Sequence, residues 1–123
     1  MSFEYFSRTA FPKGGRIFTE GDAGHHAYIV ESGMVEIFRE IDGRKTVLGT
    51  IAAGGIFGEM ALIDRSSRVA SAAALETTEL IVIPDLVFQE KLAAADPFLR
   101  GLLRVLVRNV RSLVTTHRPG DEV

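Results

Sequence analysis

The sequence predicts a mainly β fold, an antiparallel barrel or sandwich followed by helices. Short β-prone runs separated by turn residues extend from Arg16 to Ile83. After Pro84 the pattern changes to the three- and four-residue apolar spacing of helices. A length of 123 residues with 46% hydrophobic content suits one modest core. We therefore expect a single domain, residues 1–123.

The strands are predicted from alternation and from the turns between them. One β-prone run is Ala27–Val30, and a second is Met34–Glu40. Asp42 and Gly43 follow the second run, and both residue types tolerate positive φ, which favours a tight hairpin. We expect Met34–Glu40 to pair with Lys45–Ile51. Further turns are expected at Pro12–Gly15, Gly21–Asp22 and Ser32–Gly33.

Two helices are expected after the strands. Asp85 can cap a helix that runs to about Ala95, and Asp96 followed by Pro97 gives a second start signal. The last helix carries one apolar stripe, which must pack against something. Its residues are Leu99, Leu102, Leu103, Leu106, Val110 and Leu113. Residues 118–123 are expected to form a loose tail.

The stretch that begins at Phe57 is the best candidate for a binding site. Gly58 lets the backbone approach a ligand closely, and residues 60–63 suit one helical turn whose N-terminal N–H groups attract an anion. Arg68 adds a forked cationic donor for phosphate oxygens. Glu59 suits a sugar hydroxyl instead. The pair suggests a ribose phosphate; the alternative is a glycine-rich turn with a surface ion pair.

This stretch resembles the phosphate-binding cassette of the cyclic nucleotide-binding domain family. That family includes bacterial catabolite activator proteins, regulatory subunits of cyclic-AMP-dependent kinase and nucleotide-gated channels. The matching sequence is FGEMALIDRSSRVAS, from Phe57 to Ser71. The resemblance covers roughly Phe11 to Leu113. It implies an antiparallel β-roll or jelly-roll barrel over about residues 11–83, with a short N-terminal segment and C-terminal helices over about 85–116.

The resemblance also implies roles for the cassette residues. Glu59 accepts a hydrogen bond from the ribose 2′-hydroxyl, Arg68 holds the cyclic phosphate, and nearby backbone amides complete the cradle. The implied ligand-binding set is Gly58, Glu59, Met60, Ala61, Arg68 and Val69. Val69 is a departure, because many family members carry Ser, Thr or Ala at that position. Without a side-chain hydroxyl there, cyclic AMP is favoured over cyclic GMP.

The base of the nucleotide needs apolar walls. Alignment to the family places Ile37, Leu48 and Gly49 there, and an ordinary place in the barrel core is the alternative for each. Arginines at positions 100, 104, 108 and 111 share one face of the last helix, which is typical of a solvated surface. The other interpretations are a base cap, with Arg108 and Arg111 as candidates, or contact with an acidic partner.

Several classes of function are not expected. A net charge of −2 argues against direct nucleic-acid binding. Cysteine is absent, as are a nucleophile elbow, a Walker loop and closely spaced carboxylates, so we predict no catalytic residues and no enzyme. His25 and His26 point to opposite faces if they lie on a strand, so no metal site is expected. A leader and a membrane-length apolar segment are also missing, which predicts a cytoplasmic location.

We therefore predict a cyclic nucleotide-binding regulatory module that signals by moving its C-terminal helices. The resemblance implies that the last helix closes over the base, forms a homodimer, or both. No cofactor is expected besides the ligand, cyclic AMP or cyclic GMP, and the protein effector is unknown. Two alternatives stay open: a nucleotide-blind β-roll for protein association, and the sensor part of a transcription regulator that lacks its DNA-binding domain.

Overall fold

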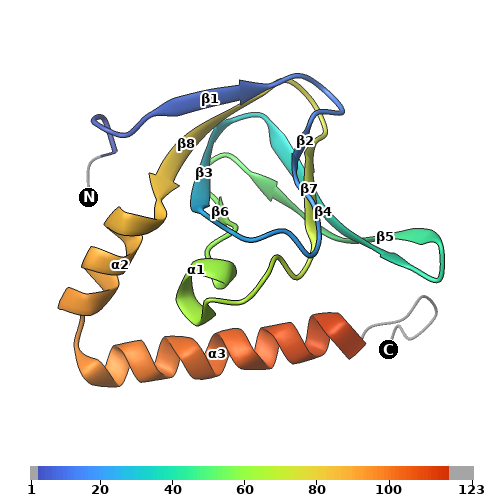
Figure 1. Ribbon diagram of the computed structural model, residues 1–123. Helices are drawn as coiled ribbons and strands as arrows, with labels where there is room; N and C mark the ends of the chain where they lie inside the picture. Colours follow the sequence, from blue (N-terminus) through green and yellow to red (C-terminus); the bar gives the residue numbers. More distant parts are fainter. Residues whose placement is uncertain (1–2, 117–123) are drawn as a thin grey trace.

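The computed structural model describes residues 3–116 of the chain. Figure 1 shows a body of strands with the helices gathered at one end. The elements in chain order are β1 (Arg8–Phe11), β2 (Arg16–Phe18), β3 (His26–Ser32), β4 (Met34–Ile41), β5 (Arg44–Ala52), β6 (Ile56–Phe57), α1 (Met60–Asp64), β7 (Ser71–Ala74), β8 (Thr78–Pro84), α2 (Asp85–Ala94) and α3 (Pro97–Thr116). The mainly β prediction, with helices at the C-terminal end, is confirmed. The predicted tail at 118–123 lies outside the described residues.

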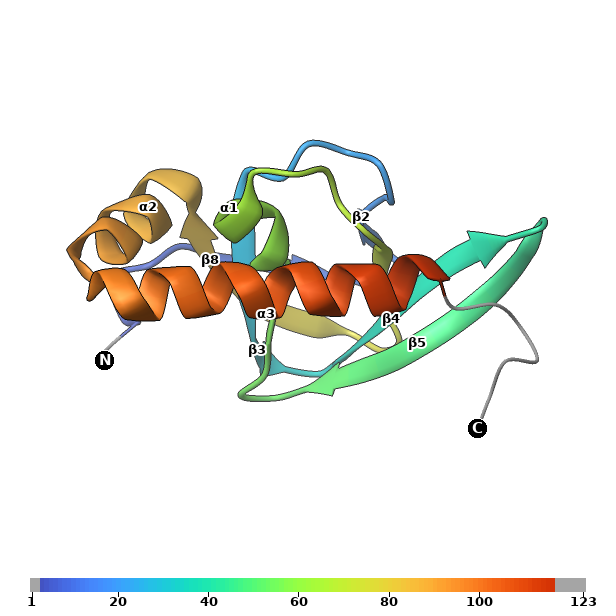
Figure 2. The ribbon, with the colours of Figure 1, turned by 90° about the horizontal axis from the view of Figure 1, so that it is seen from below.

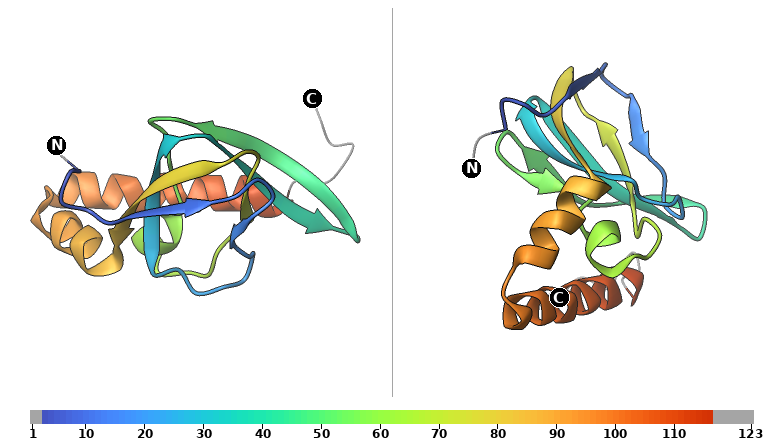
Figure 3. Two further views of the ribbon diagram at one scale, coloured as in Figure 1. Left: turned by 90° about the horizontal axis from the view of Figure 1, so that it is seen from above. Right: turned by 60° about the vertical axis from the view of Figure 1, so that its left-hand side comes forward.

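Two four-stranded antiparallel sheets form the body, in the orders β1-β8-β3-β6 and β2-β7-β4-β5. The sheets curl around a shared core, as the two views of Figure 3 show. Five buried residues make up that core: Val30, Val35, Phe57, Ala72 and Leu80. Each sheet contributes some of them, so the core holds the two sheets together through apolar burial.

The hairpin between β4 and β5 follows the sequence closely. Asp42 and Gly43 take φ values of 55° and 77°, as a tight hairpin turn requires. Pairing runs from Met34 opposite Ala52 to Ile41 opposite Arg44, which confirms the predicted strand pair. The register shifts after Ile37, so β5 contains a bulge. Figure 2 shows this hairpin extending to one side of the molecule.

Of the two predicted helix caps, the one at Asp96 is confirmed and the one at Asp85 is wrong. Asp96 caps α3 as predicted, because its Oδ1 accepts a hydrogen bond of 2.8 Å from the Phe98 amide. Asp85 is not a cap: Pro84 occupies that position, and Asp85 is the first residue of α2. Its carboxylate instead accepts a bond of 2.9 Å from Gln89 one turn later. The difference arises because β8 continues to Pro84 without an intervening loop.

Most of the apolar stripe of α3 faces solvent. Within residues 97–116 only Val107 is buried. The exposed fractions of the other stripe residues are 51% for Leu99, 42% for Leu102, 38% for Leu103, 49% for Leu106, 44% for Val110 and 72% for Leu113. Figure 2 shows α3 crossing the end of the molecule beside α1 and α2. Leu103 lines an apolar hollow together with residues of α2, so residues 3–116 cover the stripe only in part.

Across residues 3–116, every helix is too short or too polar to span a membrane.

Candidate functional site

The predicted glycine turn and helical turn both form. Gly58 has a φ of 79°, a left-handed conformation that favours glycine. Helix α1 then begins at Met60 with Glu59 as its N-cap. The amides of Leu62 and Ile63 donate to the Glu59 carbonyl, at 3.1 and 3.0 Å. Helix geometry leaves the N–H groups before them, at residues 60 and 61, without partners inside α1.

Arg68 lies buried beside this turn, with only 5% of its surface exposed. Its Nη1 donates to the Gly58 carbonyl at 2.6 Å, and its Nη2 donates to the His26 carbonyl at 2.7 Å. The guanidinium also stacks over the Phe18 ring, 4.0 Å from the ring centroid. Nε is buried without a hydrogen-bond partner among the described residues. The arginine is therefore held in one orientation while part of its donor capacity stays unused.

The two charged groups of the site affect each other. Burial raises the pKa of Glu59, opposed by a backbone hydrogen bond and by the charge of Arg68. Burial also lowers the pKa of Arg68, and the nearby acidic groups of Tyr28, Asp22 and Glu59 oppose this shift. Both groups have lost water on folding, and a polar ligand can replace it.

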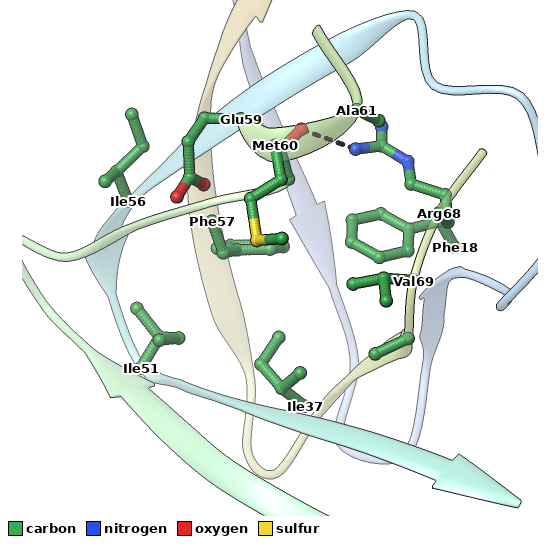
Figure 4. A pocket seen from close by; sticks show the side chains of 12 residues that line it. Phe18, Ile37, Ile51, Ile56, Phe57, Glu59, Met60, Ala61, Arg68 and Val69 are labelled. Atoms are coloured by element: carbon green, nitrogen blue, oxygen red, sulfur yellow. Dashed lines mark hydrogen bonds between the residues drawn. The ribbon is translucent and has the colours of Figure 1, made fainter. Parts of the chain in front are cut away.

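Glu59 and Arg68 line the same cavity, which measures about 170 Å³. The complete lining is Phe18, Ile37, Ile51, Ile56, Phe57, Gly58, Glu59, Met60, Ala61, Arg68, Val69 and Ala70. Figure 4 shows the Glu59 carboxylate toward one end and the Arg68 guanidinium toward the other. All six residues of the predicted ligand-binding set thus line the same cavity, together with apolar side chains.

Of the predicted base contacts, Ile37 alone lines this cavity. Leu48 is half-buried and Gly49 is exposed, and neither contributes to the lining. The bulge in β5 explains part of this, because Leu48 is the extra residue between the partners of Ile37 and Phe38. Ile51, two residues after Gly49 and so on the same face of the strand, lines the cavity instead.

Arg108 and Arg111 also lie outside the cavity. Arg111 is bound to Asp64 at the end of α1, with nitrogen–oxygen distances of 2.7 and 3.0 Å. Its Nη1 donates to the Ser67 carbonyl at 2.9 Å. Arg108 lines a separate cleft between α1 and α3. In this arrangement neither arginine is placed to cap a base.

The sequence predicted a turn at Gly21–Asp22, but not that the loop between β2 and β3 belongs to the site. The Asp22 carbonyl accepts a bond of 2.8 Å from the Arg68 amide, and the Gly21 amide donates to the Arg68 carbonyl at 2.9 Å. A Cβ on Gly24 would lie 2.8 Å from the Ala61 Cβ and 3.0 Å from the Arg68 guanidinium carbon. The second glycine of this loop was the available signal, because a glycine outside a turn often marks a close approach.

The histidine pair contributes a backbone group. His26 begins β3, and its carbonyl is one of the two acceptors for Arg68. Within residues 3–116 there is no group of three or more His, Cys, Asp or Glu side chains that could hold a metal ion. His117 lies outside the described residues.

A family model described as the cyclic nucleotide-binding domain matches residues 8–95. The chain therefore belongs to the cyclic nucleotide-binding domain family, and its paired sheets with C-terminal helices are the β-roll of that family. This confirms the resemblance drawn from the cassette.

Similar proteins include two bacterial cAMP-responsive regulators and an enzyme. The chain is 42% identical over 84 residues to the cyclic AMP receptor protein of Thermus thermophilus, which covers 68% of this chain and 39% of the relative. It is 31% identical over 118 residues to a CRP-like cAMP-activated global transcriptional regulator of Mycobacterium tuberculosis, covering 89% and 53%. Among solved structures, an EAL enzyme in its cAMP-bound form superposes with a TM-score of 0.83 at 40% identity, covering 85% of this chain and 28% of that one. The chain thus spans about half or less of each of these proteins.

Proposed function

We propose that this chain is a sensor domain that binds cyclic AMP and passes its occupancy to a protein effector. The observation that carries the proposal is that Glu59 and Arg68 line one cavity together with the helical turn between them. The names of the relatives support the choice of ligand, since they are a cyclic AMP receptor and a cAMP-activated regulator. The EAL enzyme is also known in a cGMP-bound form, so cyclic GMP is the second ligand to test.

The proposed orientation follows from the charges. The phosphodiester faces Arg68 and the free amides at the start of α1, because a charged, forked donor suits two phosphate oxygens. The ribose hydroxyl donates to Glu59. The base lies against the apolar wall, for which Ile37, Ile51 and Val69 are available.

In the proposed binding mode, the cavity must enlarge to admit a nucleotide. Ligand pockets generally measure about 300–1,000 Å³, and this cavity of about 170 Å³ is smaller. A nucleotide must therefore displace side chains or shift α1. Because α1 contacts both α2 and α3, such a shift gives the helices a different arrangement with and without ligand. This is the proposed route by which the domain signals.

No catalytic residue is part of the proposal, and the effector is a separate protein or a further part of the same one. Because the chain spans only part of its relatives, it also fits the sensor part of a transcription regulator. A nucleotide-blind β-roll is the competing function. The observation in its favour is that the Arg68 guanidinium already donates hydrogen bonds to two backbone carbonyls, those of Gly58 and His26.

Calorimetric titration with cyclic AMP, cyclic GMP and linear AMP tests the proposal. We expect micromolar or tighter binding of a cyclic nucleotide, and an affinity at least about tenfold lower for Arg68→Ala. Arg68→Lys keeps the charge but loses the fork, so it should bind with intermediate affinity. Arg44→Gln, an exposed change in β5, is the matched control.

The nucleotide-blind alternative predicts a different result from the same titration. If the wild-type protein binds neither cyclic nucleotide, the sensor proposal is wrong. Circular dichroism must show that each Arg68 variant is folded, because Arg68 is buried. A second arm compares cyclic AMP with its 2′-deoxy analogue: Glu59→Gln should weaken the ribonucleotide more, since only that ligand loses a hydrogen bond.

A further inference from the structure

A second hollow lies on the other side of α1 from the nucleotide cavity, between α1, α2 and α3. We name it the arginine cleft. It measures about 520 Å³ and is lined by Ile63, Asp64, Arg65, Ser66, Gln89, Arg104, Arg108 and Arg111. Four arginines thus surround a single carboxylate, on a chain whose net charge is −2. The positive charge is local, not a property of the whole surface.

Three of these arginines keep most of their donor capacity. Arg111 is committed to Asp64 and the Ser67 carbonyl. Arg65 approaches Asp85 at only 3.9 Å, with 68% of its side chain exposed. Within the part of the chain that the structure describes, Arg104 and Arg108 make no hydrogen bond or ion pair. Asp64 is therefore neutralised by Arg111, and Arg65 has only a long, exposed ion pair with Asp85.

The spacing of the arginines on α3 is unfavourable for the isolated helix. Arg100, Arg104 and Arg108 follow at four-residue steps, and α3 contains no Asp or Glu. Like charges at this spacing cost a few tenths of a kcal/mol for each pair, whereas solvated helix faces usually alternate charge signs. An anionic partner in the arginine cleft would attract these guanidinium groups and offset the repulsion between them.

The dimensions favour a particular kind of anion. From Arg104 to Arg108 the helix rises about 6 Å, and Arg65 adds a third guanidinium from the end of α1. Carboxylates on alternate residues of an extended peptide recur about every 7 Å. Nucleic acid would need a longer row of cations on a less acidic chain. We propose that the arginine cleft is the docking site for an acidic segment of a protein partner, held by Arg65, Arg104 and Arg108.

Fluorescence anisotropy with a labelled peptide tests this proposal without nucleotide. The peptide alternates glutamate and serine over about twelve residues, long enough to cross the cleft when extended. The test variant is Arg104→Gln with Arg108→Gln. The matched control is Lys13→Gln with Arg44→Gln, which removes the same charge from exposed positions on the β-roll. A peptide of alternating lysine and serine serves as the ligand control.

We expect saturable binding of the glutamate peptide that weakens with salt. The test variant should bind at least about fivefold more weakly, and the control variant within about twofold of wild type. Equal losses in both variants would mean only general attraction and would overturn the proposal. So would the absence of binding at low salt, or displacement by pyrophosphate at lower concentrations than by unlabelled glutamate peptide, which would indicate a site for small anions. None of these outcomes depends on nucleotide binding.

Discussion

Arg111 of α3 holds Asp64 of α1 in a two-point ion pair, with Nε 2.7 Å from Oδ2 and Nη2 3.0 Å from Oδ1. The third donor of the same guanidinium reaches the carbonyl of Ser67, the residue that precedes Arg68. The side chains of both partners are about one-fifth exposed, at 21% and 19%. One arginine of the last helix is therefore attached to the helical turn and to the loop of the nucleotide cassette.

Breaking this pair should loosen α3 selectively. We expect Asp64→Asn and Arg111→Gln each to lower the free energy of unfolding, with a coupling energy of about 1 kcal/mol in a double-mutant cycle. Hydrogen exchange should become faster in α3 and stay unchanged in the hairpin of β4 and β5. Urea denaturation and exchange mass spectrometry provide the two measurements.

The surface pair of Arg8 and Glu31 is the control for that cycle. Its side chains are 35% and 39% exposed, so its coupling energy should be smaller, below about 0.5 kcal/mol. Equal coupling energies for the two pairs would contradict the special role given to Arg111. Unchanged exchange in α3 would show that other contacts hold the helix in place.

Gly24→Ala should damage the site through packing alone. The added methyl would lie within 3.0 Å of two groups, the Ala61 side chain and the Arg68 guanidinium. Either neighbour must move, and overpacking of this kind costs about 1–3 kcal/mol. We expect a lower melting temperature together with weaker nucleotide binding, measured by calorimetry on the same samples.

Gly101→Ala gives the opposite expectation and serves as the control. Nothing lies within 4 Å of the added methyl at that position of α3. Alanine there should stabilise the helix by about 0.5–1 kcal/mol. If both alanine variants changed stability in the same direction, the close contact at Gly24 would not be the cause.

Glu59 should make stability depend on pH in an unusual direction. Burial raises its pKa in the folded protein above the ordinary value of 4.5. Between the unfolded and folded pKa values the folded state binds more protons, so stability falls as pH rises through that window. Above the window the buried carboxylate is ionised at a cost. We therefore expect Glu59→Gln to be more stable than wild type at pH 7 in the absence of ligand.

That gain should shrink as the pH falls below the ordinary carboxyl value, because wild-type Glu59 is then protonated in both states. Urea titrations of both proteins across the acidic range provide the measurement. Glu79→Gln, at an exposed position of β8, controls for a general loss of negative charge. A gain that is constant with pH, or a loss at neutral pH, would contradict the burial argument.

Local sequence predicted the features that depend on neighbouring residues. Asp42 and Gly43 determine a hairpin by themselves, and the contiguous cassette carries the turn at Gly58 with Glu59 and Arg68 at its two ends. The partners of Arg68 could not be predicted in this way. The His26 carbonyl lies 42 residues away in sequence, and the Phe18 ring comes from β2, near the start of the chain.

The sequence also did not determine which side chains of β5 and α3 face the rest of the domain. Leu48 is the extra residue of the β5 bulge, and Gly49 has no side chain to reach the cavity, whereas Ile51 on the same face lines it. On α3 the periodicity identified an amphipathic helix, but it does not say which face meets the domain. In the structure Arg104, Arg108 and Arg111 line the cleft beside α1, and most of the leucines of α3 are exposed.

The exposed stripe of α3 predicts self-association, a proposal that the resemblance also implied. Leu99, Leu103, Leu106, Val110 and Leu113 follow at alternating four- and three-residue steps, the spacing of a coiled-coil seam. A second copy would cover this apolar surface. We expect a homodimer at tens of micromolar in sedimentation equilibrium, and a monomer after Leu106→Glu. Ser112→Glu adds the same charge to an exposed position outside the seam and should remain dimeric. A monomeric wild-type protein, or equal dissociation of both variants, would exclude the stripe as the dimer contact.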